Sequence, residues 1–177
     1  YDTFVLKGTI VPYQTQKVSF ALTASAAFNE VYERDDLGPT YRDHVRSGAL
    51  TADIKLKDDF GGWNYWTVGF RQGLNVFGAS GPADDLVSRA ISSETFSLLD
   101  YAYSRYQKIT EVWSAKFAVN GQFSSTALLD SQRFFLTSSA FGSGYYSGDS
   151  GVSSSFEVRF DQSLPSTFLR GYQLYGF

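Results

Sequence analysis

The stretch from Trp113 to Ser124, WSAKFAVNGQFS, alternates between two kinds of side chain. Every second residue from Trp113 onward is apolar or glycine, and the residues between them are mostly polar. Successive side chains of a β-strand point to opposite faces of a sheet, whereas a helix repeats about every 3.6 residues. The stretch therefore predicts a long strand with one apolar and one polar face.

The same period of two recurs on both sides of this stretch. Residues 50–57 place Leu, Ala, Ile and Leu on one face and Thr, Asp, Lys and Lys on the other, and 66–71 follow the same pattern with larger residues. We expect further strands at 3–11, 19–33, 96–107, 152–160 and 168–177. Residues 19–33 and 82–92 also hold enough alanine and leucine for a short helix.

The length of these strands favours a membrane barrel. Strands of about ten residues exceed the five or six usual in soluble sandwiches and match the nine to eleven that cross a bilayer at a tilt. Short expected connections (12–17, 58–62, 108–111 and 161–167) alternate with long ones (34–47, 75–95 and 125–151), as periplasmic turns and external loops do. The predicted fold class is all-β, an antiparallel transmembrane β-barrel segment of about eight long strands. A soluble all-β binding domain is the alternative, because alternation is equally expected of a half-buried sheet.

Composition excludes several function classes. The chain of 177 residues has no cysteine and one histidine, so disulfides, thiolate metal sites and multi-histidine centres are ruled out, and we expect neither a metal nor a cofactor. The net charge of −3 gives no reason to expect a nucleic acid partner. The chain begins at Tyr1 without a methionine, and we expect a mature form or a fragment.

Two short motifs suggest chemistry that the surrounding sequence does not support. Residues 148–151 (GDSG) reproduce the sequence around a serine-protease nucleophile, and His44 precedes it in the right order, with Asp53, Asp58 or Asp59 between them. However, His44 lies in an expected polar loop, and Val-Ser-Ser-Ser follows the motif, so a turn that opens a strand is the better interpretation. Residues 142–144 (GSG) have no βαβ unit around them to form a dinucleotide loop. We expect no enzyme.

The polar faces of the expected strands carry charged residues that would line a barrel lumen. Inward residues of a wide barrel meet water, so a simple solvated wall accounts for them as well as a functional pore lining does. The residues predicted to face the lumen are Lys55, Lys57, Arg71, Lys116, Gln122, Glu157, Arg159 and Phe177.

From about Phe70 onward the chain resembles the outer-membrane transporters of two-partner secretion, the haemolysin secretion/activation family. The resemblance lies in an ordered series of motifs that covers more than half of the chain. These are FRQGLNVFGAS (70–80), LDYAYSRYQ (99–107), NGQFSS (120–125), LLDSQRFFL (128–136), SGDSG (147–151) and FEVR (156–159).

The resemblance implies a barrel of about sixteen strands preceded by periplasmic POTRA domains. On this basis residues 1–177 are a partial transmembrane β-barrel domain, a central slice, and the POTRA domains are absent from the chain. A complete eight-stranded barrel ending at Phe177 is the rival interpretation.

The resemblance also implies that the long loop before 152–160 folds into the lumen and carries a Val-Arg-Gly-Tyr/Phe motif. The corresponding residues here place serine where the family has arginine, and the aspartate that pairs with that arginine would lie beyond Phe177. The expected pore-loop residues are Gly142, Ser143, Gly144, Tyr145, Gly148, Asp149 and Gly151.

The function that the resemblance implies is export of a large haemolysin- or adhesin-type polypeptide through the outer membrane. The implied partners are the secreted polypeptide, outer-membrane lipid and the barrel assembly machinery. A relative of the outer-membrane protein insertases is the alternative.

Overall fold

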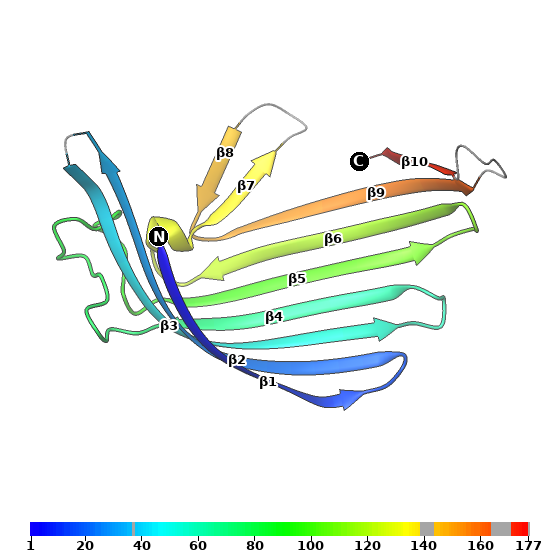
Figure 1. Ribbon diagram of the computed structural model, residues 1–177, viewed down its shortest axis with the longest axis horizontal. Helices are drawn as coiled ribbons and strands as arrows, with labels where there is room; N and C mark the ends of the chain where they lie inside the picture. Colours follow the sequence, from blue (N-terminus) through cyan, green and yellow to red (C-terminus); the bar gives the residue numbers. More distant parts are fainter. Residues whose placement is uncertain (37, 139–143, 164–170, 177) are drawn as a thin grey trace.

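Eight strands form one antiparallel sheet in which each strand pairs with its neighbours in the chain, apart from a hairpin inserted between β6 and β9 (Figure 1). The computed structural model describes residues 1–36, 38–138, 144–163 and 171–176. The strands of the sheet are β1 (Asp2–Gln14), β2 (Val18–Asp35), β3 (Gly38–Lys57), β4 (Trp63–Gly73), β5 (Ser97–Lys108), β6 (Trp113–Ser124), β9 (Gly151–Ser163) and β10 (Gly171–Gly176). The insertion consists of a 3₁₀ turn, η1 (Asp130–Gln132), and a separate two-stranded sheet, β7 (Phe134–Ser138) and β8 (Gly144–Gly148).

The all-β, antiparallel prediction is confirmed. Within the described ranges, β1 pairs only with β2 and β10 only with β9, so the sheet is open. No helix in this part of the chain is long and apolar enough to cross a membrane.

The predicted long loop at 34–47 is wrong. Strand β3 begins at Gly38 and pairs with β2 as far as Asp35, so these two strands form an extended hairpin. The polar residues that suggested a loop are satisfied across the hairpin: Glu30 lies opposite His44 and also accepts a hydrogen bond from Arg46. The helical alternatives are wrong as well, since 19–33 lies within β2 and 82–92 forms turns.

The register gives the sheet two chemically different faces. Large apolar side chains alternate along each strand and stay exposed on one face, which we call the apolar face. These exposed side chains include Leu22, Leu50, Val68, Phe70, Leu99, Phe117, Phe123, Val152 and Phe156. The opposite face, the polar face, carries most of the charged residues of the same strands: Asp53, Lys55, Lys57, Arg71, Asp100, Lys116, Glu157 and Arg159. Nearer the strand ends, Arg46 of β3 and Arg105 of β5 share the register of the apolar face.

The two ends of the sheet also differ. The β1–β2, β3–β4 and β5–β6 turns lie at one end, the turn end (Figure 1). The β4–β5 connection, the β7–β8 hairpin and the tight β2–β3 connection lie at the other, the loop end. The buried apolar cluster of the described residues lies at the loop end and joins the sheet to its loops: Val45, Phe96, Leu98, Leu128 and Leu129. A compact core therefore fixes the loops and leaves most of the sheet uncovered.

Candidate functional site

The structure places seven of the predicted lumen residues on the polar face. The continuous strand pairing from β3 through β9 puts their side chains on the same face of the sheet: Lys55, Lys57, Arg71, Lys116, Gln122, Glu157 and Arg159. Phe177 lies outside the described residues. That this face lines a pore stays a prediction.

Several charges on the polar face are balanced by neighbouring side chains. Arg71 Nη2 lies 3.3 Å from Asp100 Oδ2 on the next strand. Arg159 forms an ion pair with Glu157, which lies opposite Lys116 in the β6–β9 register. Such pairs keep a charged wall compatible with a partly desolvated position.

The connection between β6 and β9 crosses the polar face at the loop end. Arg71 Nη1 donates a hydrogen bond to Gln132 Oε1 over 3.0 Å. Gln122 Nε2 donates to the backbone oxygens of Gln132 and Asp149 over 2.9 and 3.1 Å. Two predicted lumen residues thus hold the root of the loop from which the β7–β8 hairpin rises (Figure 1).

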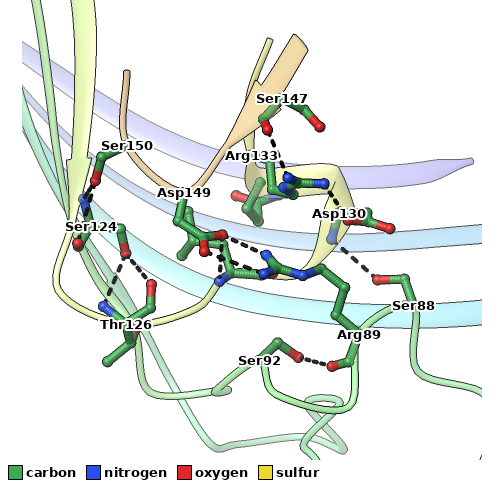
Figure 2. A network of polar contacts seen from close by, with 12 residues as sticks. Ser88, Arg89, Ser92, Ser124, Thr126, Asp130, Arg133, Ser147, Asp149 and Ser150 are labelled. Atoms are coloured by element: carbon green, nitrogen blue, oxygen red, sulfur yellow. Dashed lines mark hydrogen bonds and ion pairs between the residues drawn. The ribbon is translucent and has the colours of Figure 1, made fainter. Parts of the chain in front are cut away.

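Asp149 is the centre of this attachment (Figure 2). Its carboxylate accepts hydrogen bonds from Arg89 Nη1 and Nη2 over 2.5 and 3.3 Å, and from the backbone N–H of Leu128 over 3.1 Å. Arg89 Nη1 also donates to the carbonyl oxygen of Leu128. The hydrogen bond from Arg89 holds the pKa of Asp149 below its usual value. We call Arg71, Arg89, Gln122, Gln132 and Asp149 the loop anchor.

Further hydrogen bonds tie the loop anchor to the rest of the loop end. Ser88 donates from its backbone N–H and its hydroxyl to the two carboxylate oxygens of Asp43, and its hydroxyl oxygen accepts from the backbone of Asp130. Arg133 joins Asp130 to the backbone oxygen of Ser147 on β8 (Figure 2). The two long connections and β3 therefore form one bonded unit at the base of the hairpin.

The predicted pore-loop residues divide into three groups. Gly142 and Ser143 lie outside the described residues. The backbones of Gly144 and Tyr145 pair with Ser138 and Thr137 in the hairpin. The third group, Gly148, Asp149 and Gly151, lies where β8 ends and β9 begins.

Gly151 has a structural role that its position in the motif did not reveal. A Cβ at this residue would collide with the ring of Phe134, the first residue of β7. Gly151 therefore allows the base of the hairpin to lie directly on β9.

Sequence reasoning missed Arg89 and the apolar cluster. Arg89 belongs to 82–92, for which a helix was the alternative, and its partner Asp149 lies 60 residues away. Leu128 and Leu129 belong to one of the quoted motifs, but only the structure shows that they are buried. Adjacent leucines in an otherwise polar loop were the available signal.

The protease-like arrangement is not assembled in the described part of the chain. Ser150 Oγ accepts a hydrogen bond from the backbone of Ser124 over 2.9 Å. His44 Nδ1 lies 3.3 Å from Glu30 Oε1, on the extended β2–β3 hairpin. The described residues also contain no group of three or more acidic or histidine side chains that could hold a metal ion.

An open antiparallel sheet with one apolar face, one polar face and a loop bound to the polar face is typical of a segment of a β-barrel wall. The chain is similar in structure to CdiB from Escherichia coli, with a TM-score of 0.78, 19% identity and alignment over 92% of this chain. It thus has the fold of part of CdiB, of whose chain it covers 31%. No family model matches the sequence, and no curated protein matches it.

Proposed function

We propose that the chain is part of the wall of an outer-membrane pore that exports a polypeptide by two-partner secretion. The observation that carries the proposal is the loop anchor, which binds a long loop to the polar face of a barrel-like sheet. The similarity to CdiB, a two-partner secretion transporter of the outer membrane, supports it. The cargo in this proposal is a large haemolysin- or adhesin-type polypeptide.

The two faces of the sheet have separate roles in this proposal. The exposed apolar face contacts outer-membrane lipid, and the polar face lines the path of the polypeptide. An isolated open sheet leaves backbone groups unpaired at both edges, which is costly in a bilayer. In this proposal, further strands of the parent protein pair with these edges. The resemblance to the two-partner secretion transporters implies in addition POTRA domains and insertion by the barrel assembly machinery.

The loop between β6 and β9 controls access to the pore. Replacing residues 134–147 in the full-length parent by a short Gly-Ser linker removes the hairpin and keeps Asp149. We expect ion conductance to rise several-fold and secretion to fall, because the loop that controls access to the pore has lost its hairpin. Single-channel recording in planar bilayers and an export assay measure the two effects. Deleting residues 35–38, where β2 is joined to β3, is the control, because these residues are not part of the loop anchor. Unchanged conductance after removal of the hairpin would count against the proposal.

A further inference from the structure

A cluster of lysines and aromatic rings lies at the turn end of the polar face. Lys55 Nζ lies 4.4 Å from the ring centre of Trp63 and 5.6 Å from that of Tyr65. Lys57 Nζ lies 5.6 Å from the Trp63 ring. We call these four residues, together with Lys17, the lysine patch.

Lys55 and Lys57 lack the carboxylate partners that the arginines of the polar face have. Among the described residues, neither ammonium group has a carboxylate oxygen within 4.0 Å, whereas Arg71 and Arg159 each form an ion pair. Two acids lie close to these lysines in the sequence, and both have other partners. Asp53 accepts a hydrogen bond from the Thr67 hydroxyl. Asp58 forms an ion pair with Arg105. Two neighbouring ammonium groups repel each other, and the rings offset this repulsion only in part.

A polar cavity of about 240 Å³ lies beside these lysines, between the β1–β2 turn and β3. Its lining consists of Gln14, Thr15, Gln16, Lys17, Val18, Ser19, Lys55 and Trp63. Lysine, glutamine and serine side chains all donate hydrogen bonds to a carboxylate. In the described part of the chain, the acid paired with this lining is Asp59, which lies 3.5 Å from Lys17 and is 95% exposed on the next turn. The cavity therefore presents donors and positive charge to whatever occupies it.

We infer that the lysine patch binds carboxylate side chains of an extended acidic segment in the exported polypeptide. The inference rests on the proposed function and names the chemistry of the substrate at that site. The patch lies at the turn end, where a polypeptide enters from the periplasm, and on the polar face, away from lipid. Charge-assisted hydrogen bonds from Lys17 and Lys55 hold one carboxylate in the cavity, and Lys57 attracts the next. An extended chain suits this geometry because its successive side chains on one side are spaced like Lys55 and Lys57 on their strand.

Binding of hexaglutamate to the full-length parent in detergent tests the inference. The peptide carries a neutral fluorophore, and fluorescence anisotropy gives its dissociation constant. The variants Lys55→Gln and Lys57→Gln are each expected to weaken binding about tenfold. Lys7→Gln is the matched control, because Lys7 lies on the polar face of β1, opposite Ser25 and away from the patch. We expect its effect to be less than twofold.

The inference is overturned if native protein does not bind hexaglutamate, if the two patch variants bind it like native protein, or if Lys7→Gln weakens binding equally. The last result would show attraction to overall charge alone. Conductance of the same preparation in planar bilayers tests the proposed function separately. If the protein conducts but Lys55→Gln and Lys57→Gln leave hexaglutamate binding unchanged, only the lysine patch is refuted. A protein that forms no pore refutes the proposed function.

Discussion

Asparagine in place of Asp149 is expected to lower the free energy of unfolding by about 1–3 kcal/mol and to loosen the hairpin. Asparagine still accepts from the Leu128 N–H, but Arg89 loses its only carboxylate at hydrogen-bonding distance among the described residues. The two side chains are 19% and 31% exposed, so solvent screens the pair only in part. Unfolding in urea measures the stability, and bilayer recordings are expected to show higher conductance.

Asp85→Asn is the matched control for Asp149→Asn, because it removes the same charge from an exposed position in the same loop as Arg89. Equal effects of the two variants would contradict the role given to the loop anchor. Since the pKa of Asp149 is lowered from its usual 3.8, the stabilisation is complete above that value and is lost as the pH falls through the lower pKa of the folded state. We therefore expect a loss of stability below about pH 4, of which Asp149→Asn removes only the share that comes from Asp149, since other carboxylates also form ion pairs in the folded state.

Alanine in place of Gly121 is expected to destabilise the sheet by about 1–3 kcal/mol. A Cβ there would meet the hydroxyl of Tyr101 on one side and would lie 2.8 Å from the backbone oxygen of Gly151 on the other. The side chain of Tyr101 can move, but the carbonyl belongs to the paired strand β9, so β6 and β9 must separate locally. Urea unfolding of the full-length parent gives the change.

Gly48→Ala provides the control for Gly121→Ala, because Gly48 also lies within a doubly paired strand. Its Cβ would have an ordinary contact of 3.9 Å with the backbone oxygen of Ser25. Alanine there restricts the unfolded chain, so we expect unchanged or slightly higher stability. A similar loss of stability at both positions would show that the close approach at Gly121 is not the cause.

The alternation from Trp113 to Ser124 predicted β6 with the bounds that the structure has. The period of two is a direct consequence of strand geometry, so a long unbroken alternation is informative on its own. The error at 34–47 arose because a polar stretch is read as a loop when its partners are unknown. The carboxylate of Glu30 on β2 contacts both His44 and Arg46 on β3. Such cross-strand pairing is not visible in local sequence.

The candidate site could be predicted only in part for the same reason. Asp149 was identified from its motif. The residues of the polar face were identified from the alternation of side chains along each strand. Arg89 could not be found, because a contact between two loops depends on how the strands between them are arranged. The lysine patch needed the register as well, since it joins Lys55 of β3 to Trp63 of β4 and to the β1–β2 turn.

Single cysteines along β6 test the central claim, that one face of the sheet lines a pore and the other contacts lipid. The chain has no cysteine of its own, so each introduced thiol reports on one position once any cysteines elsewhere in the parent are replaced. A charged, water-soluble thiol reagent is applied to the full-length parent in outer-membrane vesicles. We predict reaction at residues 116, 118 and 120 and protection at 117, 119 and 123. Uniform reactivity along the strand, or reaction mainly at the second set, would contradict the account.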